Sequence, residues 1–151
     1  MKKSVFLKAI VVFVLAAFGL TGRAQSYIHE GKGIYGKVLY NWDGKNLRSG
    51  KSRYNEVLFH YDGQFIRQGS SRYNQVICSW DGRNLRSGES KYSEVLCHFD
   101  GEYVRLGDSR YGKITYYRDG NFIRKGDSRY DPVVYTISGS IPVAVLMFLL
   151  Y

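Results

Sequence analysis

The sequence has little cysteine and little proline, with two residues of each among 151. It contains no Cys-x-x-Cys pair and no Cys/His spacing of the kind that holds zinc, so we predict no metal site and no cofactor. No Gly-x-Ser-x-Gly nucleophile motif is present, and the carboxylates form no pair specific to glycoside cleavage. The sequence therefore offers no catalytic residue, and we expect a protein that is not an enzyme.

Long apolar segments are also missing, because neither run near the chain ends reaches the roughly 17–25 residues that a membrane-spanning helix needs. The first run covers residues 5–20, is interrupted by Lys8, follows two lysines and precedes a Gly-Arg-Ala sequence that ends at Ala24. This pattern is typical of a secretory signal peptide, residues 1–24, and a retained anchor is the less favoured alternative. We expect cleavage near Ala24 and export of residues 25–151, as a single domain, to the periplasm or the extracellular space.

Acidic residues are the scarcer charged class, with 13 against 22 basic residues. Four of the basic residues belong to the predicted signal peptide, so the rest of the chain is only moderately basic. This charge permits contact with acidic glycans or lipid headgroups, and it is also an ordinary charge for a protein in solution. Together with the predicted export, it argues against nucleic-acid binding.

The main feature of the sequence is a run of five tandem repeats of nineteen residues without a gap. They share the pattern Tyr-x-x-Val-Leu-φ-x-φ-Asp-Gly-x-x-φ-Arg-x-Gly-x-Ser-Arg, where φ is mostly aromatic or aliphatic. The repeats span residues 35–53, 54–72, 73–91, 92–110 and 111–129. A period this short and regular predicts a repeat architecture in which each unit packs against its neighbours.

Each repeat carries Asp-Gly at positions 9 and 10, flanked by alternating apolar residues. Asp-Gly is a strong signal for a two-residue type I′ turn, so each repeat is predicted to be a β-hairpin in which position 8 faces position 11. In the first repeat one face then holds Val38, Tyr40, Trp42 and Leu47, which we assign to the core. Since a lone hairpin is not stable, the units must bury these faces against each other.

Position 6 is aromatic in three repeats and cysteine in the other two, at Cys78 and Cys97. We interpret both cysteines as small hydrophobic residues that take the place of an aromatic side chain in the core. Export would allow a disulfide. We favour it less, because its two Cα atoms would have to lie within about 7 Å of each other.

The two ends of the repeat region indicate how the units assemble. Residues 27–34 match the second half of a repeat and residues 130–140 match the first half, so their pairing would close a ring and remove exposed strand edges. The apolar tail, residues 141–151, is too short to span a bilayer, and we predict a helix that fills the centre of the ring. A membrane-inserting tail and a final β-strand are the alternatives. The predicted fold class is all-β: a closed ring of five, or six, β-hairpin repeats with a short helix packed in the centre.

Tandem units of the form Tyr-x-x-Val-Leu-Tyr-x-x-Asp-Gly-x-φ-Ile-Arg-x-Gly-x-Ser, between a signal peptide and a short apolar tail, resemble the bacterial five-fold β-flower proteins. The resemblance covers residues 27–151 and implies a five-fold ring of β-hairpins. It implies no functional residue, because the family carries no activity that could be transferred. The chain departs from the pattern at Ser138-Gly139, which replaces Asp-Gly, and at Arg118, where the other units have an aromatic residue. These departures leave the hairpin count open between five and six.

Three further columns of the repeat are candidates for function. The arginines at position 14 are predicted to pair with a repeated aspartate or to stack on a tyrosine, and so to be structural, with the capture of acidic glycan or lipopolysaccharide phosphate as the alternative. The tyrosines at position 1 are expected to pack between units, with a sugar-stacking surface as the alternative. The basic residues at position 19 lie nearer a turn, are expected to be exposed, and are the candidate ligand-binding residues. They are Arg53, Arg72, Lys91, Arg110 and Arg129.

We therefore expect an exported, non-enzymatic binding or structural repeat protein of the cell envelope or the extracellular space. Its predicted partners are acidic polysaccharides or other envelope components, held by the basic residues at position 19. The alternative is a structural or assembly protein whose apolar tail engages a partner or a membrane. A glycan binder requires the position-19 residues to be exposed beside aromatic rings, whereas an assembly protein requires the tail to leave the ring.

Overall fold

The computed structural model describes residues 24–151, and these residues hold twelve β-strands and one helix. The predicted signal peptide lies almost wholly outside the described residues, so its cleavage and the export of the chain stay predictions. The strands are β1 (Ser26–Glu30), β2 (Val38–Trp42), β3 (Asn46–Ser49), β4 (Val57–Tyr61), β5 (Phe65–Gln68), β6 (Val76–Trp80), β7 (Asn84–Ser87), β8 (Val95–Phe99), β9 (Tyr103–Leu106), β10 (Ile114–Asp119), β11 (Phe122–Lys125) and β12 (Val133–Ser138). The helix is α1 (Val143–Leu150).

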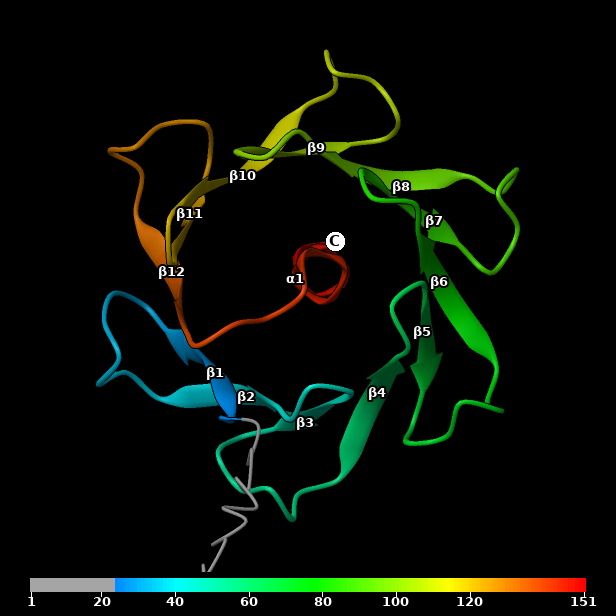
Figure 1. Ribbon diagram of the computed structural model, residues 1–151. Coiled ribbons are helices and arrows are strands. Elements are labelled where there is room, and N and C mark those ends of the chain that lie inside the picture. The colour runs from blue at the N-terminus through cyan, green and yellow to red at the C-terminus, as the bar shows by residue number, and fades with distance from the viewer. Residues whose placement is uncertain (1–23) are drawn as a thin grey trace, which may run out of the picture.

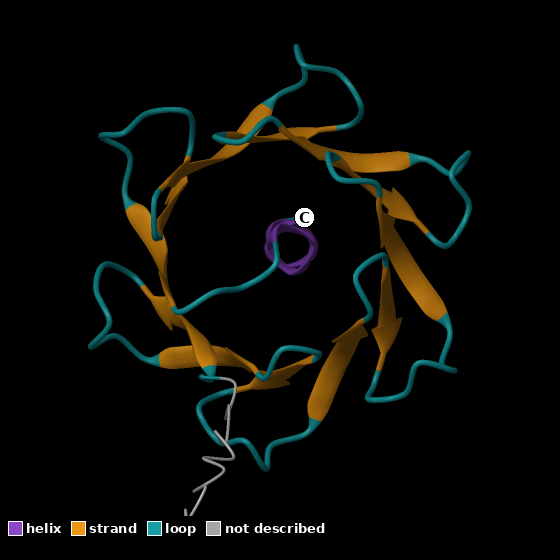
Figure 2. Cartoon of the chain, viewed as in Figure 1, coloured by secondary structure: helices purple, strands orange, loops and turns teal. Residues whose placement is uncertain are grey.

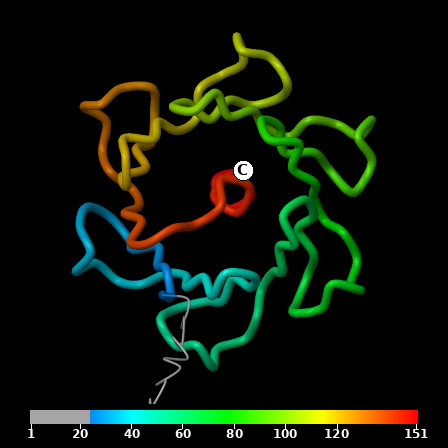
Figure 3. Tube along the Cα trace, viewed as in Figure 1, coloured from blue at the N-terminus to red at the C-terminus, as the bar shows by residue number. Residues whose placement is uncertain are grey.

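The strands form a closed antiparallel ring in which each strand pairs with its neighbours in sequence and β12 pairs with β1. Figures 1 and 2 show this ring with α1 at its centre. The trace in Figure 3 shows the connections between successive hairpins extending outward, whereas the tail after β12 turns inward. The predicted fold class is thus confirmed. Within residues 24–151 no helix is both long enough and apolar enough to cross a membrane.

The described residues form six hairpins, because β12 and β1 build the sixth from the two ends of the repeat region. Ile137 of β12 faces Ile28 of β1, which is the register in which Trp42 faces Leu47 in the first repeat. The sixth hairpin therefore has the pairing of the other five, with one strand from each half-repeat. The predicted closure of the ring by the half-repeats is confirmed, and the count that the sequence left open is six.

Hydrogen bonds take the place of a turn at the seam between β12 and β1. The Ser26 hydroxyl donates to the carbonyl oxygen of Ser140 (3.0 Å) and accepts a hydrogen bond from the Ser140 N–H group (2.9 Å). Gly139 stands at the turn-glycine position with a φ of +85°, and a Cβ atom on it would collide with the Ser26 side chain. The two ends are therefore in direct contact.

The hairpin turns differ from the predicted register by two residues. Trp42, at position 8, faces Leu47, at position 13, so the two central turn residues are Gly44 and Lys45. The Asp43 carboxylate accepts hydrogen bonds from the N–H groups of the second and third residues after it, at 2.9 and 2.8 Å. Gly44 has a φ of +99°, and within residues 24–151 no residue other than glycine has a positive φ. The prediction of type I′ turns was wrong, because a type I′ turn needs a positive φ at both central residues. A single glycine at the first of the two central residues is the pattern of a type II′ turn.

The same shift brings position 12 of each repeat opposite position 7 of the next repeat. Asn46 thus faces His60, with 3.0 Å between Asn46 Oδ1 and His60 Nδ1. Tyr103 stacks on Tyr117 with 5.3 Å between the ring centroids. These contacts join neighbouring hairpins on the strand face that points away from the helix. The other pairs are mixed, because Phe65 faces Ser79 and Phe122 faces Thr136.

The inner face of the ring is apolar and packs around α1. Position 13 is at most 1% exposed in every repeat, at Leu47, Ile66, Leu85, Val104 and Ile123. Within α1, Val145, Leu146 and Met147 are buried, and Phe148 meets Phe59 edge-on with 4.6 Å between the ring centroids. The tail is therefore a helix in the centre of the ring, as predicted.

The predicted core face of the first repeat is largely confirmed. Trp42 and Leu47 are buried, and Tyr40 packs against the core while remaining partly exposed. Val38 is half-buried. Asn41, on the opposite face, is also fully buried, because the loop after β3 covers it. Its amide donates to two carbonyl oxygens of that loop, at 2.7 and 3.2 Å.

Cys78 and Cys97 are buried free thiols, as the core interpretation predicts. They lie on β6 and β8, with β7 between them. Strands are about 4.8 Å apart, so the two Cα atoms are roughly 10 Å apart, beyond the reach of a disulfide. Burial raises the pKa of Cys78 to about 11 and that of Cys97 to about 12, which keeps both thiols protonated and unreactive. Among residues 24–151 no three His, Cys, Asp or Glu side chains gather as a metal site requires.

Candidate functional site

The position-14 arginines form ion pairs within their own hairpins, in agreement with the structural role predicted for them. Each lies 3.0–3.5 Å from a carboxylate oxygen of the aspartate that opens the turn of its repeat. The pairs are Arg48–Asp43, Arg67–Asp62, Arg86–Asp81, Arg105–Asp100 and Arg124–Asp119. Each arginine also donates to a carbonyl oxygen of the loop that leads into the next unit. It therefore ties its own turn to the neighbouring hairpin.

The sixth hairpin replaces this ion pair with a histidine–serine contact. His29 and Ser138 stand where the other units have arginine and aspartate, and His29 Nε2 lies 3.0 Å from Ser138 Oγ. The imidazole also lies 3.3 Å, through Nδ1, from the carbonyl oxygen of Gly36 in the next loop. His29 is 6% exposed. Its position and its two contacts match those of the arginines, although its chemistry differs.

Four of the turn aspartates are held in the ionised form. Burial raises the pKa of each carboxyl, but two backbone N–H groups of the turn and the paired arginine outweigh it, so the pKa lies below its ordinary value. This holds for Asp43, Asp62, Asp81 and Asp100. A carboxylate with a lowered folded-state pKa contributes stability above the unfolded-state value of about 3.9, and this contribution is lost as the pH falls through the folded-state pKa.

We therefore expect the urea midpoint of unfolding to fall as the pH drops from 5 to 2. Replacement of Asp81 by asparagine is expected to reduce this pH dependence, because one of the carboxylates that must be protonated is gone. Asp108→Asn, a change of an exposed carboxylate outside the turns, serves as the control and should leave the dependence as it is. Equal pH dependence in the Asp81 variant and the parent protein would show that the turn carboxylates do not carry the acid sensitivity.

The position-19 residues are exposed, and each lies over an exposed tyrosine ring. The distance from the cationic group to the ring centroid is 4.9–5.8 Å. The tyrosines, which open the following repeats, are 81–88% exposed. We call these five pairs the cation–tyrosine belt: Arg53–Tyr54, Arg72–Tyr73, Lys91–Tyr92, Arg110–Tyr111 and Arg129–Tyr130.

A local turn produces the belt in every unit. In the first repeat the carbonyl oxygen of Ser52 accepts a hydrogen bond from the Asn55 N–H group (3.1 Å), and the Ser52 hydroxyl accepts one from the Tyr54 N–H group (3.2 Å). The turn thus holds Arg53 and Tyr54 at its outer corner, and the serine hydroxyl at position 18 bonds to the local backbone. The expectation that the tyrosines pack between units was wrong, because the corner points away from the neighbouring hairpins.

Charge is unevenly distributed around the belt. Position 17, two residues before each belt cation, is lysine or serine in the first half of the chain and acidic in the second half. The residues in chain order are Lys32, Lys51, Ser70, Glu89, Asp108 and Asp127. The outer loops near β1 to β5 therefore carry cations and have no acidic residue at position 17. In the other half of the ring, a carboxylate at position 17 accompanies each belt cation.

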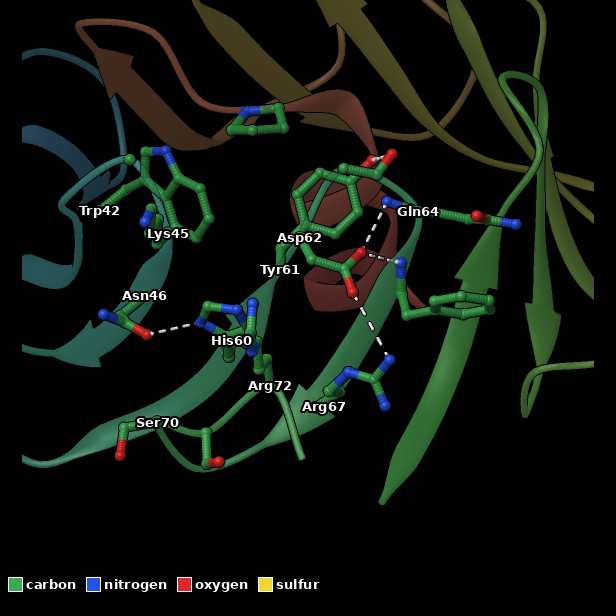
Figure 4. Close-up of a pocket in the computed structure, with 15 residues that line it drawn as sticks. Trp42, Lys45, Asn46, His60, Tyr61, Asp62, Gln64, Arg67, Ser70 and Arg72 are labelled. Carbon is green, nitrogen blue, oxygen red and sulfur yellow. Dashed lines mark hydrogen bonds and ion pairs between the residues drawn. The ribbon is translucent and has the colours of Figure 1, made fainter. Parts of the chain in front are cut away.

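An open hollow of about 1250 Å³ lies in the positive half of the ring, between the first two hairpins. Figure 4 shows side chains from the turn after β2, from β4 and β5, and from the loop after β5 around it. Its lining includes Trp42, Lys45, Tyr61, Arg67, Ser70 and Arg72. Arg72 is the one predicted ligand-binding residue that lines this hollow. The repeat pattern does not predict the hollow itself, because nothing in it says where neighbouring units leave space.

Comparison with known proteins agrees with this architecture. The family model of the 6-fold beta flower proteins matches residues 28–146, so the chain belongs to this family. The resemblance to β-flower proteins noted from the repeat is thereby confirmed, and the number of units is six where the sequence resemblance implied five. No curated protein and no solved structure matches the chain. The protein is therefore a structural repeat protein of the β-flower class.

Proposed function

We propose that this repeat protein binds acidic polysaccharides through its cation–tyrosine belt. The observation that supports the proposal is the repeated exposure of a cation and an aromatic ring side by side, at five tips of one ring. A tyrosine more than 80% exposed contributes nothing to the core, so its recurrence at every tip calls for a role at the surface.

The chemistry of each pair suits an acidic sugar. A guanidinium group binds a carboxylate, sulfate or phosphate through two parallel hydrogen bonds. The neighbouring tyrosine ring offers a flat apolar surface and a hydroxyl group to the sugar ring. One such contact is weak, but several contacts along one polymer raise the overall affinity by a factor of 10²–10⁴ or so.

The alternative, an assembly protein that acts through its apolar tail, has less support. It requires the tail to leave the ring, whereas α1 is buried in the centre and residues 144–147 are at most 4% exposed. A purely structural role, in which the protein has no ligand, is the other alternative to binding through the belt. The predicted signal peptide would bring the protein to the periplasm or the extracellular space, where acidic polysaccharides occur, and this location is part of the proposal.

The test is binding of the purified protein to alginate, a polyuronate, and to lipopolysaccharide, at low and at high salt. We expect binding that weakens with salt, since exposed ion pairs are screened, and no binding to neutral dextran. Replacement of Arg53, Lys91, Arg110 and Arg129 by alanine should weaken binding to the polyuronate at least tenfold. The variant keeps Arg72, which also lines the hollow between the first two hairpins.

A matched control removes the same charge elsewhere on the surface. Lys37, Arg83, Lys113 and Lys125 are exposed cations that lie outside the belt, and their replacement by alanine lowers the net charge equally. This variant should retain most of the binding. Equal loss in both variants would mean that net charge alone attracts the polymer, and no binding of the parent protein at low salt would sink the proposal.

A further inference from the structure

We infer that the hollow between the first two hairpins is a separate site for a single monosaccharide that carries a phosphate or carboxylate group. Three cations line it, Lys45, Arg67 and Arg72, against the carboxylate of Asp62. The Asp62 carboxylate is already engaged by two backbone N–H groups of its turn, at 3.0 and 2.8 Å. Positive charge in the hollow thus exceeds negative charge, which favours an anion.

Two variable positions of the repeat carry no carboxylate where they line this hollow. Ser70 stands at position 17, where the following three units have Glu89, Asp108 and Asp127. Lys45 stands at position 11, where the fourth unit has Glu102. A carboxylate at either place would repel an anion in the hollow. The two units that form the hollow therefore lack carboxylates at two positions where later units carry them, as an anionic ligand requires.

Arg67 is the least firmly held of the five position-14 arginines. Its contact with Asp62 is 3.5 Å long, whereas the other four pairs measure 3.0–3.3 Å. Its Nε atom is also the one buried side-chain nitrogen or oxygen without a hydrogen-bond partner that residues 24–151 contain. Its guanidinium group can turn toward an anion in the hollow at a smaller cost than the guanidinium groups of the other units can.

The lining also provides surfaces for the body of a sugar. Tyr61 is half-buried, with its hydroxyl donating to the carbonyl oxygen of Gly63 (2.7 Å), and Trp42, which is 4% exposed, also lines the hollow. The hydroxyl groups of Ser70 and Ser71 can donate to or accept from sugar hydroxyls. Apolar rings with a few convergent polar groups are the ordinary composition of a small-molecule site.

Titration calorimetry of the purified protein with glucose 6-phosphate tests this inference, with glucose and inorganic phosphate as reference probes. We expect saturable binding of glucose 6-phosphate, at least tenfold weaker binding of inorganic phosphate, and no measurable binding of glucose. Ser70→Asp should weaken the binding of glucose 6-phosphate at least tenfold. The side chain it introduces occurs at this position in the fourth and fifth units, so the fold should tolerate it.

Two controls separate this site from its surroundings. Asp108→Ser makes the reverse change at the equivalent position of the fourth unit and should leave binding unchanged. The belt variant with four alanines should also bind glucose 6-phosphate normally, so that failure of the belt and failure of the hollow are distinguishable. Absence of saturable binding, equal binding of phosphate alone, or unchanged binding in Ser70→Asp would each overturn the inference.

Discussion

Removal of residues 141–151 is expected to leave the chain without a cooperatively folded state. Ile141, Val145, Leu146, Met147 and Leu150 are each at most 8% exposed. Burial of one such side chain stabilises a protein by about 1.5–3 kcal/mol, so the five together contribute roughly 7–15 kcal/mol. This equals the entire net stability of an ordinary domain, about 5–15 kcal/mol. The inner face of the ring would also lose its packing partner and face water.

Far-UV circular dichroism with thermal melting measures this effect. The shortened chain should show no sigmoidal transition, whereas deletion of Tyr151 alone, which is 59% exposed, should leave the melting temperature unchanged. A chain ending at Ser140 that melts cooperatively near the temperature of the parent protein would contradict the proposed role of α1 as the core of the ring. The ring would then be stable by its strand pairing alone.

Leu85→Ala is expected to destabilise the protein by about 2–5 kcal/mol. Leu85 is 0% exposed, faces Trp80 and Cys97 across the neighbouring strands, and lies on β7, against which α1 packs. Truncation therefore leaves a cavity between the ring and α1. Neither the strands nor the helix can fill this cavity without breaking other contacts. Urea unfolding monitored by tryptophan fluorescence gives the change in the free energy of unfolding.

The same substitution at an exposed leucine provides the control for Leu85. Leu106 is 42% exposed and also lies on a strand of the ring. Leu106→Ala should change the free energy of unfolding by less than about 0.5 kcal/mol, as surface substitutions usually do. Similar effects at the two positions would indicate that the strand, rather than the packing against the helix, determines the cost.

The ring, the central helix and the position-14 ion pairs could be predicted, because each follows from a feature that is plain in the sequence. An Asp-Gly pair in every unit predicts a hairpin, matching half-repeats predict closure, and an uncharged tail has to be buried somewhere. The turn register could not be predicted, because Asp-Gly fits two types of turn that differ by two residues in pairing. The Asp43 carboxylate decides between them by capping the turn, an interaction that the sequence pattern allows but does not require.

The exposed tyrosines and the hollow show a second limit of the repeat pattern. A tyrosine that recurs every nineteen residues is as consistent with packing between units as with display at a corner. The choice depends on where the Ser-Arg-Tyr turn points, which three-dimensional context sets. The hollow depends on how two particular units diverge, and a consensus that averages over units removes the differences at Lys45 and Ser70.

The seam between β1 and β12 has a consequence for how the ring is made. All the other pairings join consecutive strands and can form soon after synthesis, but Ile28 and Ile137 are separated by most of the chain. The entropy of closing a loop of about 100 residues costs roughly 4 kcal/mol, so this step comes late. Until then the first strand has an open edge that another chain can occupy. The strand that is synthesised first is thus the last to have both edges paired. Until β12 pairs with it, a strand of another unfolded chain can compete for the open edge of β1.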